Sequence, residues 1–307
     1  MTETGAKSTT GPIAFIGLGM MGLPMASRLV RAGFDVRGSD LSEQARSAFS
    51  ANGGTAVGDA RVAADGASIV ITMLPDDRVV REALLGPHGA VAALSAGALV
   101  MDMSSSAPVA TQQLAADLTP RGISLVDAPV SGGVRRALDG SLAIMAGGDP
   151  AAIKRAQPLF EAMGKSIFPT GPVGSGHAVK ALNNYVSAAG LAAACEASII
   201  AEKFGIDPNI LVDVLNASTG RNNSTEVKMK PFILSGSFAS AFSMQLMAKD
   251  LRTAADLAGQ LGIDADGARN AAKLWARASQ TLGKSADHTE IYRYLAARGG
   301  PAQEDSQ

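Results

Sequence analysis

The chain has little cysteine, few aromatic residues and no excess of charge of either sign. Cys195 is the single cysteine among 307 residues, so an internal disulfide framework is excluded and a reducing compartment is favoured. Lysine and arginine number 27 against 28 aspartate and glutamate, a net charge of −1. Because no long basic run is present, nothing predicts a nucleic acid or a membrane surface as a partner. We therefore expect a soluble, cytoplasmic protein.

Long apolar runs and clustered metal ligands are also missing. No stretch approaches the ~18 consecutive apolar residues of a membrane span. The polar residues at the amino terminus lack the apolar core of a signal peptide, and we expect residues 1–10 to be a disordered lead. The three histidines and one cysteine are scattered, so no metal site is predicted.

The chain does have the length for about two domains and 47% hydrophobic residues with which to fill their cores. In its first half, short apolar runs alternate with helical patterns, which is typical of βαβ units and a parallel sheet. The expected strands are Ile13–Ile16, Asp35–Ser39, Ser68–Leu74, Leu99–Met103, Ser124–Asp127, Leu142–Ala146 and Ser166–Phe168.

The pattern changes after Gly176. The segment Ala178–Phe204 is rich in alanine and nearly free of glycine, which predicts one long and largely buried helix. Only helical patterns follow it. We therefore predict an α/β Rossmann domain with a mostly parallel, doubly wound sheet over residues 11–173. An all-α domain over residues 174–298 would follow, beginning with a linking helix at 176–204.

A glycine-rich turn follows the first expected strand and precedes a helix. Its sequence from residue 17 to 22 is GLGMMG, so the glycines have the spacing of a dinucleotide-binding fingerprint. The first glycine would permit the tight turn, the second the approach of a pyrophosphate, and the third the packing of helix on strand. The residues expected to surround the phosphates are Gly17, Leu18, Gly19, Met20, Met21 and Gly22.

Asp40 ends the second expected strand, about 20 residues after the glycines, where an acidic residue accepts hydrogen bonds from a ribose. Its carboxylate would repel a 2′-phosphate, and Leu41 and Ser42 follow it, so we predict NAD as the cofactor. Arg37 and Arg46 lie close enough in the sequence to keep NADP open.

Two further motifs suggest chemistry on a small acid. Ser131, Gly132 and Gly133 follow an expected strand, and consecutive glycine N–H groups beside a hydroxyl can hold a carboxylate. Lys180 and Asn184 are four residues apart and share one face of the long helix. A lysine can move a proton on a substrate oxygen while an amide fixes that oxygen in place.

These motifs together resemble the β-hydroxyacid dehydrogenase family, which includes 3-hydroxyisobutyrate dehydrogenase and tartronate semialdehyde reductase. The resemblance extends from about Ile13 to Leu295 and rests on motifs in the family's order. The motifs are IGLGMMGLPMA, DAPVSGG with GSLAIMAGG, GSGHAVKALNNY, and MAKDL at Met247–Leu251.

The resemblance implies roles that spacing alone does not. It makes Lys180 the catalytic lysine and Asn184 the amide near the reacting carbon, with a small carboxylate as substrate. The other residues it implicates bind substrate or cofactor: Ser131, Gly132 and Gly133 at the substrate carboxylate, Lys249 at the substrate and nicotinamide, Phe242 beside the nicotinamide, Leu74 and Pro75 over the adenosine, and Ser105 at the nicotinamide ribose. Asp250 would position its segment, and the helical domain would form a homodimer or homotetramer.

Arg135 and Arg136 depart from the small residues common at their positions in the family. A guanidinium there could contact a second acidic or hydroxylated group of the substrate, or both arginines could be solvated.

Other readings stay open. 6-Phosphogluconate dehydrogenases place a histidine where this chain has Asn183, and imine reductases generally lack the equivalent of Lys180. A non-catalytic dinucleotide-binding module on the same fold would be expected to have lost Lys180 or the Ser131 loop. Substrates consistent with the motifs are 3-hydroxyisobutyrate, tartronate semialdehyde or glycerate, threonate-like sugar acids and 3-hydroxypropionate.

Overall fold

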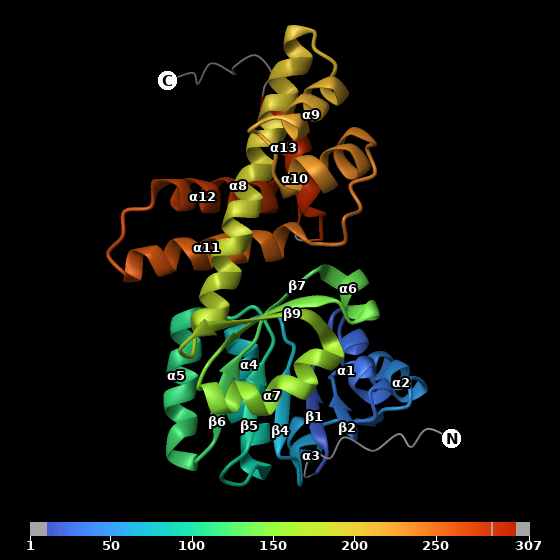
Figure 1. Cartoon of the computed structure of the whole chain (residues 1–307), viewed down its shortest axis with the longest axis vertical. Helices are drawn as coiled ribbons and strands as arrows, with labels where there is room; N and C mark the ends of the chain where they lie inside the picture. Colours follow the sequence, from blue (N-terminus) through green and yellow to red (C-terminus); the bar gives the residue numbers. More distant parts are fainter. Residues whose placement is uncertain (1–10, 284, 299–307) are drawn as a thin grey trace. The chain divides into compact units, whose positions relative to one another are not determined.

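The computed structural model describes residues 11–283 and 285–298 (Figure 1). The described chain divides into two compact units between Lys180 and Ala181, within one long helix. A mostly parallel sheet with helices forms the first unit and helices form the second, which confirms the predicted fold class. The predicted lead, residues 1–10, lies outside the described residues.

The sheet of the first unit has nine strands in the described part of the chain, in the order β3-β2-β1-β4-β5-β6-β8-β7, with β9 beside β8. Strands β1 to β6 pair in parallel, whereas β8 is antiparallel to β6 and β7. The strands are β1 (Ile13–Ile16), β2 (Val36–Ser39), β3 (Thr55–Val57), β4 (Ile69–Thr72), β5 (Leu99–Asp102), β6 (Ser124–Asp127), β7 (Val130–Ser131), β8 (Leu142–Gly147) and β9 (Gly164–Gly171).

The central strands are apolar without alternation because both faces of the sheet are covered. Ile13 and Phe15 enter one core cluster, whereas Ala14 and Ile16 enter the other. Helices α1, α2 and α7 contribute to the first cluster, and α3, α4 and α5 to the second. The helical segments of this unit are α1 (Gly22–Arg31), α2 (Glu43–Ala51), α3 (Ala60–Ala64), α4 (Asp77–Leu85), η1 (Ala90–Ala93), α5 (Pro108–Leu118), η2 (Thr119–Arg121), α6 (Gly133–Asp139) and α7 (Pro150–Met163).

The strand order reverses beside β1. The chain moves from β1 to β2 and β3 on one side, then returns to place β4 on the other side of β1. At such a reversal the loops after neighbouring strands separate, and ligands bind outside the carboxyl ends of the strands. The loops after β1, β2, β4 and β5 therefore meet where the sequence predicts the cofactor.

The second unit is built around α8, the long helix whose first residues belong to the first unit. Trp275, Leu191, Cys195 and Leu251 are completely buried in its core. The helical segments are α8 (Ser175–Phe204), α9 (Pro208–Ala217), α10 (Asn223–Val227), η3 (Met229–Leu234, a π-helix), α11 (Met244–Gln260), α12 (Asp266–Leu282), η4 (His288–Glu290) and α13 (Ile291–Ala297).

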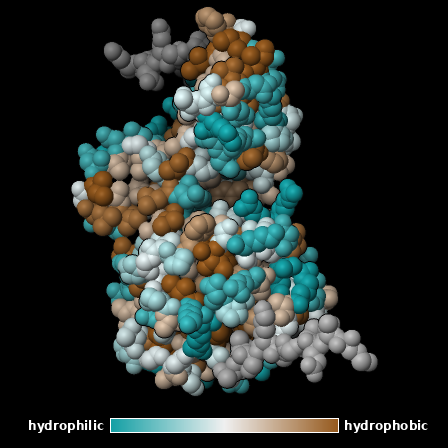
Figure 2. Space-filling view, viewed as in Figure 1, coloured by the Kyte–Doolittle hydropathy of each residue, from teal (hydrophilic) through white to brown (hydrophobic). Residues whose placement is uncertain are grey.

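Helix α8 is less buried than the sequence predicted. Val186 and Ile200 are each 68% exposed and Phe204 is 83% exposed. Brown, hydrophobic surface is visible on the helical unit in Figure 2. The expectation of a largely buried helix is therefore wrong for this single chain, because apolar residues occupy more of the helix surface than the unit's core can cover.

By length and composition alone, α8 is also apolar enough to cross a membrane, although the sequence analysis expected no such stretch. In the structure 44% of its most apolar window is buried inside the protein. Lys180, Asn183 and Asn184 lie on the same helix, and polar groups of this kind are costly in hydrocarbon. These observations favour a core helix of a globular unit.

Candidate dinucleotide site and active site

The glycines of the loop after β1 each meet a different steric requirement. Gly17 has a φ of +98°, and a Cβ there would lie 2.3 Å from the carbonyl oxygen of Met73. A Cβ at Gly22 would lie 1.9 Å from the carbonyl oxygen of Gly17, so α1 packs directly on the turn. Apart from its two chain neighbours, no residue has an atom within 4 Å of the Cβ position at Gly19, so the loop is open there.

The start of α1 suits an anion. Its N-cap, Met21, provides no side-chain acceptor, and its first turn contains no acidic residue. Free N–H groups at a helix N-terminus bind phosphate, and no carboxylate occupies the position here. Gly19 is exposed, and its neighbour Met20 is 70% exposed. The residues present therefore fit the pyrophosphate of a dinucleotide.

Asp40 lies beside the glycine loop, as its place after β2 predicts. Its carboxylate accepts hydrogen bonds from the backbone N–H of Leu18, at 2.7 Å, and of Ser42, at 2.8 Å. These two bonds orient the carboxylate, and each of its oxygens keeps a lone pair for a ribose hydroxyl.

Both arginines near Asp40 donate hydrogen bonds to backbone carbonyl oxygens. Arg37 donates from Nη1 to the carbonyl oxygen of Asp65, at 2.8 Å. Arg46 donates from Nη1 to the carbonyl oxygens of Asp40, at 2.7 Å, and Leu41, at 3.1 Å. Arg46 thus supports the loop that presents the carboxylate.

A buried carboxylate at the end of β5 organises the next two loops, a role that the sequence analysis missed. Asp102 accepts hydrogen bonds from Thr72 Oγ1, at 2.8 Å, and Ser106 Oγ, at 2.7 Å. Its Oδ1 also accepts from the backbone N–H of Ser104, whose hydroxyl accepts from the N–H of Leu74. The loops predicted to contact the cofactor at Leu74, Pro75 and Ser105 are therefore joined through one carboxylate.

The predicted carboxylate cradle follows β7. Gly132 has a φ of +133° and Gly133 a φ of +66°, both in the region that favours glycine. A Cβ on Gly132 would lie 2.4 Å from the Arg136 side chain. Ser131 and the two glycines thus form a tight turn into α6 that larger residues would strain.

A second buried carboxylate, Asp127 at the end of β6, fixes the start of α8. It accepts hydrogen bonds from the backbone N–H groups of Gly174, at 2.7 Å, and His177, at 2.8 Å. Burial raises the pKa of this carboxyl, while the His177 ring and these backbone donors oppose the shift. A carboxylate that ends a buried strand, as in SLVD and LVMD, was the available sequence signal for both groups.

His177 is buried near the start of α8. Its Nδ1 lies 2.8 Å from Thr111 Oγ1, and that hydroxyl also donates to the carbonyl oxygen of Ala107 at 3.1 Å. Because a hydroxyl has one proton, Nδ1 of His177 is the donor to Thr111. Its Nε2 lies 3.7 Å from Asp102 Oδ2, so the imidazole stands between the carboxylates that order both loops. Lys180 follows one turn later on this anchored helix.

Side chains of two helices hold the amide predicted to contact substrate. Asn184 Nδ2 donates to Asp250 Oδ2 at 2.6 Å, and Lys249 Nζ lies 3.3 Å from Asp250 Oδ1. The Asn184 Oδ1 accepts from Asn183 Nδ2 at 3.2 Å. Asp250 therefore joins α8 to α11, and the second amide proton of Asn184 can be donated to another acceptor.

Phe242 lies just before α11 and is held by His288. The backbone N–H of His288 donates to the carbonyl oxygen of Phe242 at 2.8 Å, and the two rings meet edge to face at 5.6 Å. The imidazole is also stacked at 6.4 Å from Trp275. This packing orders the segment that contains Phe242 within the second unit.

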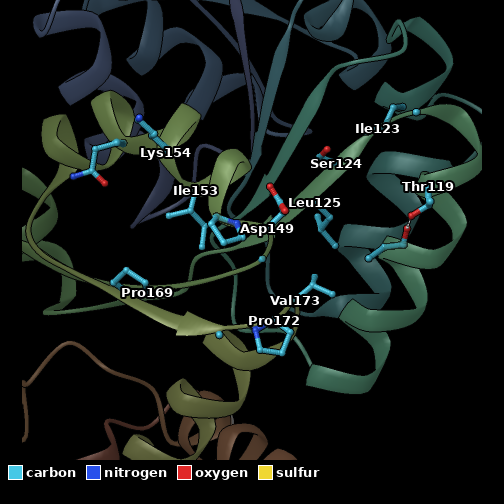
Figure 3. Close-up of a pocket in the computed structure, with 16 residues that line it drawn as sticks. Thr119, Ile123, Ser124, Leu125, Asp149, Ile153, Lys154, Pro169, Pro172 and Val173 are labelled. Atoms are coloured by element: carbon cyan, nitrogen blue, oxygen red, sulfur yellow. Dashed lines mark hydrogen bonds between the residues drawn. The ribbon is translucent and has the colours of Figure 1, made fainter.

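A hollow of about 980 Å³ in the first unit contains none of the predicted site residues (Figure 3). Two of its polar side chains bind nearby backbone: Asp149 caps α7 through the N–H groups of Ala151 and Ala152, and the Thr119 hydroxyl donates to the carbonyl oxygen of Ala115. Polar groups of a reactive site converge on a ligand instead, so we assign the chemistry to the motifs above. Among the described residues no cluster of three or more metal-ligating side chains occurs.

Comparison with known proteins identifies both parts of the chain. Residues 12–171 match the family model described as the NAD binding domain of 6-phosphogluconate dehydrogenase. Residues 174–295 match the model described as NAD-binding of NADP-dependent 3-hydroxyisobutyrate dehydrogenase.

Individual relatives extend over most of the chain. It is 39% identical over 250 residues to 2-(hydroxymethyl)glutarate dehydrogenase of Eubacterium barkeri, covering 81% of this chain and 83% of that protein. It is 37% identical over 251 residues to 3-sulfolactaldehyde reductase of Escherichia coli, covering 82% and 84%. The solved structure of Mycobacterium tuberculosis 3-hydroxyisobutyrate dehydrogenase with L-serine matches with a TM-score of 0.86 at 35% identity, covering 94% of this chain and 99% of that one.

Proposed function

The chain belongs to the 3-hydroxyisobutyrate dehydrogenase family of NAD(P)-dependent oxidoreductases, and we propose that it interconverts a small β-hydroxyacid and its semialdehyde or ketone. NAD(P), when bound, accepts or returns the hydride. The chain's own residues bind the acid, orient its hydroxyl and move one proton. The observation that carries the proposal is the placement of Lys180 and Asn184 one turn apart on α8, with Asn184 fixed by Asp250.

Lys180 acts as the acid and base. In oxidation its neutral amine takes the proton of the substrate hydroxyl, and in reduction its ammonium returns a proton to the carbonyl oxygen. Two arrangements support this role. The Asp127 carboxylate anchors the first turn of α8, which leads into Lys180. The bond from Asn184 to Asp250 uses one amide proton and leaves the second for the same substrate oxygen. Lys249 contacts substrate and nicotinamide.

Ser131, Gly132 and Gly133 hold the substrate carboxylate. The backbone of the two glycines supports this role, because both have a positive φ and successive N–H groups in a turn can bind an anion. The glycine loop from Gly17 to Gly22 holds the pyrophosphate. The loops at Leu74, Pro75 and Ser105 contact the nucleosides, and Phe242 contacts the nicotinamide.

We propose that NAD is preferred over NADP. Asp40 presents a carboxylate that a 2′-phosphate would meet at close range, and Arg37 and Arg46 are engaged by backbone carbonyls. The name of one relative denotes an acid with two carboxylates, 2-(hydroxymethyl)glutarate, which supports polar β-hydroxyacids as substrates.

We propose domains at residues 11–173 and 174–298, because the two family models meet there. We also propose a cytoplasmic homodimer or homotetramer. The exposed apolar side chains Val186, Ile200, Phe204 and Ile210 of the second unit support association through that unit.

The test is a screen of short β-hydroxyacids and their semialdehydes, with NAD and NADP in parallel, followed by the absorbance of the reduced nicotinamide. We expect turnover of at least one acid, faster with NAD. A preference for NADP would overturn the role of Asp40 and leave the reaction class intact. Tight cofactor binding without turnover of any acid would favour the non-catalytic module.

A further inference from the structure

Lys228 is a partly buried lysine of the second unit to which the mechanism above assigns no role. It lies between α10 and η3. Burial lowers the pKa of its ammonium group to about 8, against the opposing charges of Asp287 and Cys195. An ammonium withdrawn from water is costly unless it has partners, so its surroundings indicate what it is for.

The protein supplies few partners for this amine. Its Nζ lies 3.3 Å from Ser187 Oγ, the one hydrogen bond that the described residues give it. An ammonium has three protons to donate, and no described carboxylate lies within 4.0 Å of Nζ. Two donors of a desolvated cation are therefore available to an acceptor outside the protein.

Neighbouring cations differ from Lys228 in this respect. Three of them in the second unit have a carboxylate within ion-pair distance: Arg221 with Glu226, Lys230 with Asp213, and Lys249 with Asp250. Their charges are compensated within the protein.

The charge of Asp287 acts on Lys228, but its carboxylate accepts hydrogen bonds from other residues. It accepts from Ser240 Oγ at 2.8 Å, and from the backbone N–H and the hydroxyl of Thr289 at 2.9 Å and 2.5 Å. It also lies 3.5 Å from the Nδ1 of His288. Asp287 is therefore a distant counter-charge and no direct partner of Lys228.

The hydrogen bond to Ser187 places the Lys228 amine beside α8, the helix that contains Lys180 and Asn184. Lys180, Asn184 and Ser187 lie at spacings of four and three residues, so they share one face of the helix. Because an α-helix rises about 1.5 Å per residue, Ser187 lies about 4.5 Å beyond Asn184 along the axis. Lys228 thus places a cation roughly one turn beyond the amide that holds the reacting hydroxyl.

We propose that Lys228 binds a second anionic group of the substrate, a carboxylate or sulfonate, and that the enzyme is selective for β-hydroxyacids with two anionic groups. This inference rests on the proposed function, since it extends the same substrate site. Lys228, with Ser187 beside it, holds the second anionic group.

The direct test compares Lys228→Met with the wild type on two substrates, 3-hydroxyisobutyrate and 2-(hydroxymethyl)glutarate, which differ by a second carboxylate arm. Methionine keeps the length of the side chain and removes its charge. A charged hydrogen bond in a desolvated place is worth roughly 10- to 100-fold in binding. We expect kcat/KM for the dicarboxylate to fall by that factor, mainly through KM, with the monocarboxylate little changed. Lys230→Met, on the same segment but paired with Asp213, is the control.

The pH dependence gives a second readout. Since the amine loses its proton above about pH 8, the KM for the dicarboxylate should rise there, while the KM for 3-hydroxyisobutyrate should not. The three ionisable groups whose charges are coupled to that of Lys228 titrate outside that range. Burial raises the pKa of the Cys195 thiol to about 12 and lowers the pKa of His288, and hydrogen bonds hold the pKa of Asp287 well below its usual range.

Calorimetry of glutarate and pentanoate with the NAD-loaded protein separates this inference from the proposed function. The wild type should bind glutarate more tightly, and Lys228→Met should abolish that difference. If neither hydroxyacid is turned over, the proposed function fails, while the calorimetric difference still decides the role of Lys228. If Lys228→Met weakens the binding of mono- and dicarboxylates equally, or weakens neither, the inference is overturned.

Discussion

The two units hold their polar groups in place by different means. In the first unit the polar groups of the site are largely backbone groups, and glycines and buried carboxylates fix their positions. Asp127, for example, accepts hydrogen bonds from the backbone N–H groups of Gly174 and His177. In the second unit, side chains from different helices hold one another, as Asn184, Asp250 and Lys249 do. A substitution in the first unit therefore acts through the fold of a loop, whereas one in the second can remove a single contact and leave the helices intact.

The largest expected effect comes from Lys180, the last residue of the first unit. Lys180→Ala should lower kcat by about 10²- to 10⁴-fold, the usual effect of removing a positioned acid or base. The dissociation constant for NAD should stay close to that of the wild type, because the glycine loop and Asp40 are untouched. Stopped-flow turnover and titration of NAD would measure the two effects separately.

Lys203→Ala is the matched control, since Lys203 is an exposed lysine in the last turn of the same helix. It should leave kcat and NAD affinity unchanged. Near-normal turnover by Lys180→Ala would contradict the assignment of Lys180 as acid and base.

A smaller effect, on stability, compares a carboxylate in each unit. Burial raises the pKa of Asp127 in the first unit. Burial also opposes ionisation of Asp287 in the second unit, but hydrogen bonds from His288, Thr289 and Ser240 outweigh it and hold the pKa of that carboxyl well below its usual range. A carboxyl with a lowered pKa stabilises the fold above about pH 4 and loses that contribution as the pH falls, whereas one with a raised pKa loses stability as the pH rises.

Acid should therefore destabilise the second unit first. Asp287→Asn should lower the stability of this unit at neutral pH by about 1.5 to 3 kcal/mol, through lost charged hydrogen bonds, and should flatten its decline below about pH 4. The chain's single tryptophan, Trp275, is buried in the core of the second unit, so its fluorescence reports that unit. Asp207→Asn, at the exposed cap of α9, is the control, because asparagine caps as well as aspartate. An unchanged acid midpoint in Asp287→Asn would refute the assignment.

The first unit was also the easier one to predict. The strands Ile13–Ile16 and Ser124–Asp127 have their predicted bounds, because continuous apolar runs mark them. Asp40 was identifiable as the end of a strand at a fixed distance from the glycines. The strands β3 and β7 were missed, because two or three residues are too few for a periodic pattern to emerge.

The contacts between distant segments could not be read from the sequence in either unit. Nothing local indicates that Asp102 joins the loops after β4 and β5, or that Asp250 holds Asn184 across 66 residues. The polar residues before α10 serve their own segment, since Asn222 caps α10 and Arg221 pairs with Glu226. No sequence pattern marks Lys228, a few residues later, because its distance from carboxylates is a property of the folded unit.

The smallest expected effect is that of Arg135→Ala, and it tests which unit binds the second anionic group of the substrate. Arg135 and Arg136 are both exposed on α6, but the aliphatic part of Arg136 covers Gly132, where a Cβ would lie 2.4 Å from it. Arg135→Ala should change kcat/KM for mono- and dicarboxylates by less than about twofold, as for an ordinary surface residue. Arg136→Ala is its comparator and should raise the KM of both acids together, because it loosens the turn that holds their shared carboxylate. If Arg135→Ala instead lowers the preference for the dicarboxylate, the second anionic group binds to the first unit. The selectivity assigned to Lys228 would then have to be given up.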